Sequence, residues 1–482
     1  MKRFFLLTAA LCLVLTLILA GCTTGEVDRY KELQSAMKSN DMELSAAFLE
    51  SASSFADVSA FLKIWAANAD PEVSSDKEHY IVIKNPATDG WKDKPTTTLQ
   101  CHVDPAHIRQ DLDLLSLSMA CLLGPLEHGK ITLMVTEDDE EDLFGGAKTV
   151  KKKSLKKKHL IHLELDDSAM VYTLGAVAAT GHMSCKAGRT EPEYTEAYRI
   201  TMTIPRHADP FTFDKEKSNP NPVETIGNLL ASNKSAGRLF EIASFTSEVE
   251  KGFLPHEASA VIVLDENNVE SFTKKFESSF EGIEKKYKDK EKKKKKNGPE
   301  DPDEEEEPLF TYTMEPVEMP EKVLKQKASD NIVSLMYTLH PGINEQDEET
   351  GEIMAVSYIS GISTADERFT LDVKMRSKTE DALQNLSGTN QVISGLCDVK
   401  YKESEPKRVW SSDPEGHLAD FFFRAVDAEK DTTPVLLARS EADVLGKRGS
   451  DLDMIYYRVN KDHRNKAIKN ILAFTAGEDV PE

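Results

Sequence analysis

Three short apolar runs with the character of β-strands mark the stretch between residues 96 and 164, and they cover residues 96–101, 131–135 and 159–163. An apolar run at 112–123 predicts a helix between the first two strands. Strand, helix and strand in this order are typical of an open parallel sheet. Ligands of such sheets bind at the carboxyl ends of the strands, so we expect a functional site at this edge.

The rest of the chain predicts further elements of both kinds. Apolar residues at helical spacing predict one helix over 46–67, and an apolar run predicts a strand over 80–84. From about residue 186 the pattern changes to an α+β arrangement in which strand and helix patterns recur, which indicates two similar halves. The expected elements there are strands at 198–204, 258–264, 353–359 and 369–375 and helices at 222–230, 269–287 and 379–396. Near the end of the chain, a helix at 418–426, strands at 434–437 and 453–459 and a helix at 467–474 would complete the first sheet.

These patterns divide the chain into two expected domains, which agrees with its 482 residues, too many for one ordinary domain. The first is an α/β domain formed by residues 41–185 and 398–482. The second is an α+β domain inserted at 186–397. Blocks of lysine and then of acidic residues at 288–308 predict a solvated or disordered loop within it.

The first 22 residues have the composition of a bacterial lipoprotein signal peptide. Lys2 and Arg3 precede an apolar run at 4–19, and small residues then lead to Cys22. The run is shorter than the roughly 20 apolar residues of a membrane span. We therefore expect lipid on Cys22, a polar tether over 23–40, and a protein anchored at the extracytoplasmic face of a cell membrane.

The charge of the chain limits the kinds of partner that it is expected to bind. The formal net charge of -23 excludes nucleic acid as a preferred partner, because nucleic acid rewards basic surfaces. Lysines at 151–153 and 156–158 nevertheless form a basic patch. A solvated face or loop is the favoured interpretation, and contact with anionic lipid or wall polymer is the alternative.

Four cysteines remain beyond the signal peptide, and none has the C-x-x-C spacing of a zinc finger or a thioredoxin. Cys101 and Cys121 lie in apolar runs and are predicted to be buried thiols. A disulfide is compatible with an exported protein. The sequence does not pair these two with Cys185 or Cys397.

Candidate chemistry collects where the three first strands end. His102 and Asp104 are two residues apart after the first strand, Glu137 and Asp138 follow the second, and Glu164 follows the third. Imidazole and carboxylate are ligands of zinc-like ions, and a carboxylate beside a metal-bound water can accept its proton. Taken singly, these residues also fit a helix cap or a solvated turn. Their common position at one edge favours a site, to which Asp111, at the start of the expected helix, is a further candidate.

Several segments together resemble the aminoacyl-histidine dipeptidases, members of the di-zinc peptidase family that also includes aminoacylase and carboxypeptidase G. The similarity runs in the family's order from about residue 40 to the end of the chain. The resemblance implies a zinc-peptidase-like catalytic domain with a central mixed sheet and an inserted, ferredoxin-like lid domain. The segments are 81–90, 99–104, 124–127, 134–138 with 144–145, 253–258, 375–377, 440–445 and 451–454.

The resemblance also implies a role for each candidate residue. His102 and Asp111 would be metal ligands, the second bridging two zinc ions, and Asp104 would orient His102. Glu137 would be the general base. Asp138 and Glu164 would also be metal ligands. In the inserted domain, His207 and Arg376 would bind the substrate.

The chain also departs from the family's pattern. Only residues 105–110 separate Asp104 from Asp111, where the family has a longer glycine-rich segment, and the family's Glu-Glu pair is Glu137-Asp138 here. The family's histidine-rich loop near the C-terminus is missing, and His463 is the nearest candidate. The Gly-His-Ser-Gly motif of the family's inserted domain is replaced here by Pro-Arg-His-Ala-Asp at 205–209. These losses predict a site that holds one or two zinc ions, or none.

Three functions remain open on these grounds. The first is a lipid-anchored metallo-dipeptidase with a degenerate site, acting on short peptides. The second is a non-catalytic relative that binds a peptide or a protein. The third is a solute-binding lipoprotein of a transporter. The sequence also leaves open whether the chain forms a homodimer.

Overall fold

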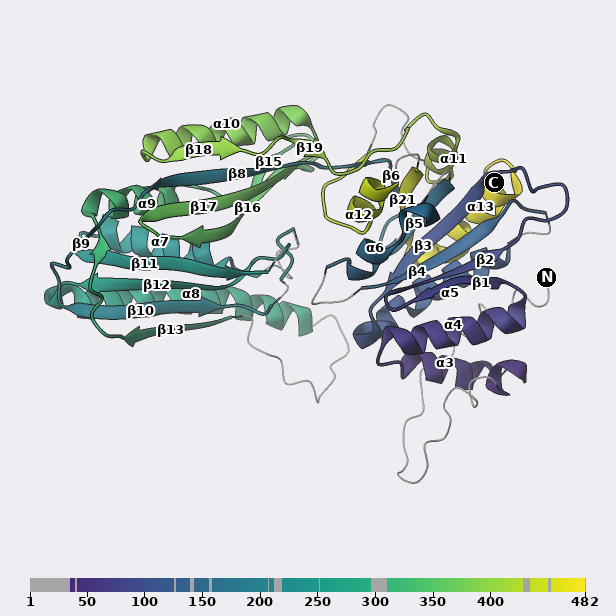
Figure 1. Cartoon of the computed structure of the whole chain (residues 1–482), viewed down its shortest axis with the longest axis horizontal. Helices are drawn as coiled ribbons and strands as arrows, with labels where there is room; N and C mark the ends of the chain where they lie inside the picture. The colour runs from purple at the N-terminus through teal and green to yellow at the C-terminus, as the bar shows by residue number, and fades with distance from the viewer. Residues whose placement is uncertain are drawn as a thin grey trace, which may run out of the picture. The chain divides into compact units, whose positions relative to one another are not determined.

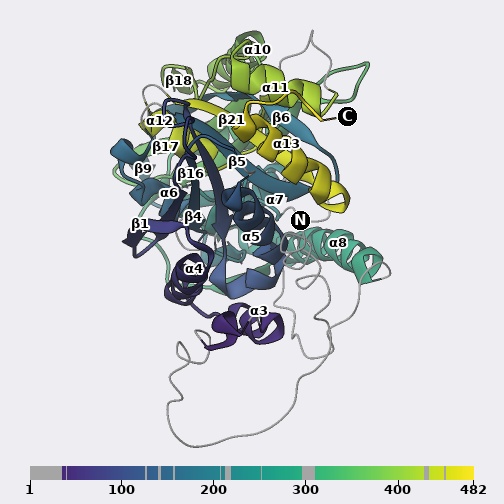
Figure 2. The same ribbon diagram turned by 90° about the vertical axis from the view of Figure 1, so that its right-hand side faces the viewer.

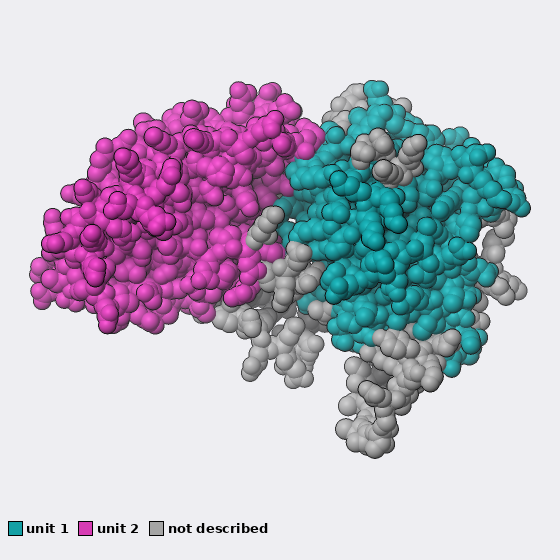
Figure 3. Space-filling model, viewed as in Figure 1, with its two compact units in different colours: residues 1–175, 409–482 teal, residues 176–408 magenta. Residues whose placement is uncertain are grey.

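The computed structural model divides the chain into two compact units, coloured teal and magenta in Figure 3. Unit 1 comprises residues 1–175 and 409–482, and unit 2 comprises residues 176–408. Unit 2 is thus the insertion, and it starts at 176 and ends at 408 rather than at 186 and 397, because β8 (Val177–Lys186) pairs within it. The structure describes residues 35–39, 41–124, 127–138, 143–155, 158–206, 208–211, 219–250, 252–295, 310–427, 434–449 and 452–481.

Unit 1 is built on a mixed sheet (Figure 1). Its strand order is β1-β2-β4-β3-β5-β21-β6, in which β4, β3, β5 and β21 run parallel. The expected strands at 96–101, 131–135, 159–163 and 453–459 are its parallel centre, so that part of the prediction is confirmed. The bounds are β1 Glu72–Lys77, β2 Tyr80–Asn85, β3 Thr96–Val103, β4 Ile131–Glu137, β5 Lys158–Asp166, β6 Met170–Tyr172 and β21 Asp453–Asn460. A short pair, β7 Leu174–Gly175 and β20 Val435–Leu436, accompanies the sheet.

Helices cover both faces of this sheet (Figures 1 and 2). One face shares a single apolar cluster with α4, α5, α11 and α13, to which β2 contributes Ile81 and Ile83. Side chains alternate along a strand, so Tyr80, Val82 and Lys84 lie on the second face. The helices and short 3-10 turns are α3 Met42–Glu50, α4 Phe55–Ala69, η1 Pro105–His107, α5 Ile108–Leu123, α6 Gly145–Thr149, η2 Lys152–Ser154, α11 His417–Ala425, α12 Ala442–Arg448, η4 Lys461–His463 and α13 Arg464–Ala476.

Unit 2 contains two similar halves, as the recurring pattern predicted, and each has the ferredoxin-like topology that the resemblance implied. In the first half, strand, helix, two strands, helix and strand form an antiparallel sheet in the order β11-β12-β10-β13. The elements are β10 Glu196–Thr203, α7 Pro222–Ser235, β11 Phe240–Val249, β12 Pro255–Leu264, η3 Glu266–Asn268, α8 Val269–Lys295 and β13 Thr311–Pro316.

The second half repeats this topology around the first. Its strands lie in the order β15-β16-β17-β8-β18, with β8 contributed from before the first half and the others from after it. The two halves pack where β11 meets β16. The elements are β8, α9 Gln326–Thr338, β15 Gly342–Gln346, β16 Ile353–Ser363, β17 Arg368–Ser377, α10 Glu380–Leu396 and β18 Lys400–Glu403, with the short strands β9 Arg189–Thr190, β14 Val323–Leu324 and β19 Lys407–Arg408.

Two local predictions were wrong. The single helix expected over 46–67 is two helices, because Ser54 caps α4 through a bond from the Asp57 amide, and the Asp57 carboxylate accepts a bond from the Ser53 amide. The loop expected over 288–308 is wrong for residues 288–295, because α8 continues to Lys295, and residues 296–308 lie outside the described residues. Lysine and glutamate are good helix formers, which outweighs the charge pattern that predicted a loop.

Other expectations concern the cysteines and the membrane. Cys101 and Cys121 are fully buried free thiols, as predicted, and burial raises the pKa of Cys101 to about 12. Within the ranges given above, no helix has both the length and the apolar composition to cross a bilayer. The signal peptide with Cys22, and residues 23–34 and 40 of the expected tether, lie outside the described residues.

Candidate active site at the carboxyl edge of the unit 1 sheet

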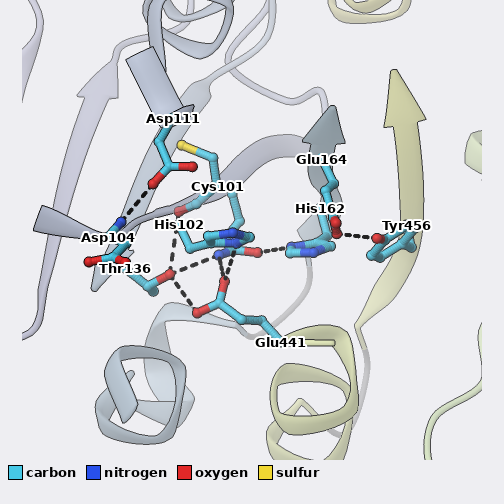
Figure 4. A network of polar contacts seen from close by, with 10 residues as sticks. Cys101, His102, Asp104, Asp111, Thr136, His162, Glu164, Glu441 and Tyr456 are labelled. Carbon is cyan, nitrogen blue, oxygen red and sulfur yellow. Dashed lines mark hydrogen bonds and ion pairs between the residues drawn. The ribbon is translucent and has the colours of Figure 1, made fainter. Parts of the chain in front are cut away.

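Polar side chains from three neighbouring strands line the second face of the sheet near its carboxyl edge (Figure 4). β3 provides Gln100 and His102, β4 provides Thr136, and β5 provides His162. Their neighbours Cys101 and Val135 belong to the apolar cluster on the opposite face. The alternation of side chains along a strand therefore turns the polar set toward α12.

Glu441, which directly precedes α12, is the centre of this polar set. Its carboxylate is buried, with 1% of the side chain exposed, and it accepts hydrogen bonds from Thr136 Oγ1 at 2.7 Å and from Gln100 Nε2. Its Oε2 lies 3.7 Å from Nδ1 of His102. A carboxylate in so dry a place needs a positive partner, and His102 supplies it.

The two partners shift each other's pKa. Burial opposes ionisation of Glu441, but the proximity and charge of His102 outweigh burial and lower the pKa of the carboxyl group. Burial likewise opposes protonation of His102, but Glu441 outweighs it and raises the pKa of the imidazole. Glu441 therefore favours the protonated ring of His102, and a metal ion could bind its Nε2 only after that nitrogen loses its proton.

A second chain of contacts leads from Glu441 along the same face of the sheet, through β3 to β5 and β21. Gln100, which donates to Glu441, accepts a hydrogen bond from Nδ1 of the fully buried His162. Burial lowers the pKa of His162 to about 4, so this ring is neutral. The ring of His162 packs against the ring of Tyr456 at 4.8 Å between centroids, and the Tyr456 hydroxyl donates to Glu164.

Asp104 and Asp111 are tied to each other and to the turn between them. The amide of Asp104 donates to Oδ2 of Asp111 at 2.7 Å, and Nδ1 of His107 lies 2.7 Å from Oδ2 of Asp104. Burial raises the pKa of Asp111, although the Asp104 amide partly offsets this. The short segment 105–110 forms η1 and the first residues of α5, which brings the two acids together.

Asp138 completes the group of acids near His102. Burial raises its pKa to about 6, the charge of His102 opposes that shift, and the carboxylates of Glu441, Asp104 and Asp111 add to it. The backbone of Asp138 donates to the carbonyl of Val103, which holds the end of β4 beside the end of β3.

Glu137, the predicted general base, is engaged elsewhere. Its Oε2 lies 2.5 Å from Nδ1 of His79, in the turn between β1 and β2. The start of α6 packs closely against the same backbone. A Cβ on Gly146 would lie 2.5 Å from the carbonyl oxygen of Glu137 and 2.7 Å from that of His79, so only glycine fits there.

Comparisons with solved structures agree with this architecture. The chain is similar to an aminoacylhistidine dipeptidase from Vibrio alginolyticus, with a TM-score of 0.51 and 16% sequence identity over 91% of this chain and 97% of that one. The chain has the fold of an aminoacylhistidine dipeptidase. Weaker similarities are to an aminopeptidase PepT from Bacillus cereus (TM-score 0.43, 10% identity, 93% and 98% covered) and to a dinuclear metal-binding peptidase of the M20 family from Bacillus subtilis (TM-score 0.35, 6% identity, 92% and 99% covered). No protein-family model and no curated protein sequence matches the chain.

The residues of this edge do not fit a zinc ion as they are arranged. In the described ranges, no group of three or more His, Cys, Asp or Glu side chains converges on a point that a metal could occupy. His102, Asp104, Asp111 and Asp138 are near one another. His102, Asp104 and Asp111 contact protein partners, and Asp138 is bonded to Val103 through its backbone amide. Glu164 is bound by Tyr456, and Glu137 by His79.

Two residues of unit 2, Arg376 and His207, were expected to contact the substrate. Arg376 lies on β17, is only 5% exposed, and has its guanidinium 5.3 Å from the ring centre of Phe211. That ring packs in turn against Tyr358. Arg376 is therefore largely enclosed by its own unit. His207 lies outside the described residues.

The residues that the sequence left without a role are Gln100, Thr136, His162, Tyr456 and, above all, Glu441. The segment that contains Glu441 was already one of those resembling the dipeptidases. Alternation along β3 and β5 places Gln100 and His162 on the face of His102, and this was the one available signal.

Proposed function

We propose that this protein is a lipid-anchored, non-hydrolytic relative of the metal-dependent dipeptidases. It would use the dipeptidase fold to bind a peptide or a protein partner at the extracytoplasmic face of a membrane. The anchor rests on the lipoprotein signal that ends at Cys22. The acidic net charge of -23 keeps nucleic acid out of this proposal.

One observation carries the loss of hydrolysis: Glu441 forms an ion pair with His102, the first residue of the expected ligand set. A metal ligand must be deprotonated to bind, and Glu441 favours the protonated imidazole. Removing His102 from Glu441 would leave a buried carboxylate without its cation, which is costly. A metal ion at Nε2 of His102 would therefore have to displace the proton that Glu441 favours on the ring, whereas Nδ1 would keep its contact with Glu441.

The decisive experiment measures metal content and turnover on one preparation. The full chain is purified in neutral detergent, incubated with zinc or manganese, desalted and submitted to elemental analysis. The same sample is then offered a dipeptide library that includes aminoacyl-histidine dipeptides. We expect a small fraction of one ion per chain and no turnover.

A Glu137→Gln variant controls for contaminating peptidases. Close to two ions per chain, with turnover that disappears in this variant, would overturn the proposal and establish the alternative, an active zinc dipeptidase. That alternative is favoured by the proximity of His102, Asp104, Asp111 and Asp138 at one edge. Light scattering on the same sample decides whether the chain is a homodimer.

A further inference from the structure

A pocket on the second face of the unit 1 sheet gathers lysines at the end opposite the candidate active site. It has a volume of about 590 Å³ and lies over β1 and β2, bordered by η2 and the first residue of β5. In the sheet register Lys84 is opposite Thr132, whereas His102 is opposite Thr136. Four residues along a strand correspond to roughly 13 Å, which separates Lys84 from His102 along the sheet. The lining also reaches Tyr80, which is opposite Thr136. The lysines that line the pocket are Lys77, Lys84, Lys151, Lys153 and Lys158.

Two of these lysines are partly buried but have no acidic side chain as an ion-pair partner in the described ranges. Lys84 and Lys158 are half-buried, as is Lys130 beside them, and none of the three forms an ion pair with a residue of the described ranges. Burial, together with the charges of Lys130 and Lys84, lowers the pKa of Lys158 to about 8. Half-buried like charges repel one another, so these lysines give the pocket a positive field.

The acids near the pocket do not neutralise this field. Asp76, the one carboxylate in its lining, is bound by Lys63 at 2.7 Å and by the Ser59 hydroxyl at 2.7 Å. Glu72 acts favourably on Lys84 but does not form an ion pair with it, and burial and the charge of Lys130 have larger effects. The concentration of lysine is therefore local, in a chain whose net charge is -23.

We propose that this pocket binds a phosphate group, carried either by a small soluble molecule or by a phospholipid headgroup. Each lysine offers three donors and no acceptor, and lysine binds phosphate as a point charge. A phosphate has oxygens on every side, so it can accept hydrogen bonds from lysines that border the pocket on β2, in η2 and on β5. A carboxylate has acceptors along one edge only. Ser75 and Ser154 add hydroxyl donors to the lining.

The size of the pocket agrees with a ligand larger than inorganic phosphate alone. Small-molecule sites typically have volumes of about 300–1,000 Å³, and this pocket of about 590 Å³ falls within that range. The inference is independent of the proposed loss of hydrolysis, because the lining of the pocket includes neither Glu441 nor any residue that contacts it.

Calorimetric titration of the full chain in a neutral detergent tests the inference. The probes are inorganic phosphate, pyrophosphate and a short-chain phosphatidylglycerol, with sodium chloride of equal ionic strength and short-chain phosphatidylcholine as references. A Lys84→Gln/Lys158→Gln double variant is compared with a Lys400→Gln/Lys469→Gln variant. The second pair loses the same charge at exposed lysines on β18 and α13.

We expect saturable binding of at least one phosphate probe that is about tenfold or more weaker in the pocket variant and unchanged in the control variant. Binding of pyrophosphate or phosphate identifies a soluble ligand, and binding of phosphatidylglycerol alone identifies a headgroup. No saturable binding, or equal binding by the pocket and control variants, overturns the inference. Thermal unfolding followed by tryptophan fluorescence verifies that each variant is folded.

Discussion

Oε2 of Glu441 lies 3.7 Å from Nδ1 of His102, and this pair joins α12 to the centre of the unit 1 sheet. The carboxylate also accepts bonds from Thr136 and Gln100, so one buried side chain connects β3, β4 and α12. The dipeptidase fold thus has an ion pair within the protein where the family's pattern leads one to expect a ligand of zinc. A metal ion at Nε2 of His102 would have to displace a proton that Glu441 favours on the ring.

Replacing Glu441 by alanine is expected to lower the free energy of unfolding of unit 1 by about 3–5 kcal/mol, because His102, Thr136 and Gln100 lose a buried partner. All three tryptophans, Trp65, Trp91 and Trp410, lie in unit 1, so urea unfolding followed by tryptophan fluorescence reports on that unit.

A double-mutant cycle with His102→Ala separates the pair from the rest of the network. We expect a coupling energy of about 1–3 kcal/mol between the two positions. A loss below about 0.5 kcal/mol in Glu441→Ala would contradict the central place given to this carboxylate.

The elements were largely predictable from the sequence, whereas the network was not. Apolar runs and helical spacing are local signals, and they located β3, β4 and β5. Glu441 is 341 residues from Gln100 and 305 from Thr136, so no local pattern links them. The basic patch at 151–158 was recognised and interpreted as a solvated face. Its setting depends on Lys84 and Lys130, which only the sheet brings beside it.

Zinc and chelators are expected to leave the stability of unit 1 unchanged. A ligand that binds the folded state alone raises its stability by an amount that grows with the ratio of its concentration to Kd. Without three converging ligands in the described ranges, that ratio stays small at micromolar zinc. Thermal unfolding with added zinc, and again with a chelator, checks this. A zinc-dependent rise in Tm that disappears in His102→Ala would show that His102 does bind metal.

Gly146→Ala is expected to destabilise unit 1 by about 1–3 kcal/mol, because the added methyl group would lie 2.5 Å from the Glu137 carbonyl oxygen and 2.6 Å from its amide nitrogen. Backbone atoms cannot move aside without shifting α6 or the end of β4.

Gly388→Ala is the matched control for this substitution. Gly388 lies within α10, and a Cβ there would have no neighbour within 4 Å. That variant should gain up to about 1 kcal/mol from helix propensity. Thermal unfolding followed by circular dichroism compares the two, and equal melting temperatures would refute the close packing assigned to Gly146.

Lys158→Gln is expected to stabilise unit 1 at pH 7, because the charged amine is unfavourable in the folded protein. We expect a gain of about 1–2 kcal/mol, which is less than the full pKa shift implies, since solvent screens part of the effect. Folding lowers the pKa of this amine from 10.5 to about 8 through burial and the charges of Lys130 and Lys84. The unfolded chain therefore binds this proton more tightly than the folded one. The penalty is complete below pH 8 and is relieved as the pH rises from 8 toward 10.5.

The stability difference between Lys158→Gln and the unchanged protein should accordingly shrink over this range of pH. Lys469→Gln, at an exposed position on α13, should show no such trend. Urea unfolding at pH 7, 8, 9 and 10, followed by tryptophan fluorescence, measures both differences on unit 1. A difference that does not vary with pH would mean that Lys158 keeps its ordinary pKa, and the pocket would then lack the positive field from which phosphate binding was inferred. Saturating pyrophosphate should reverse the sign of the difference at pH 7, because the bound anion converts the repulsion at Lys158 into attraction.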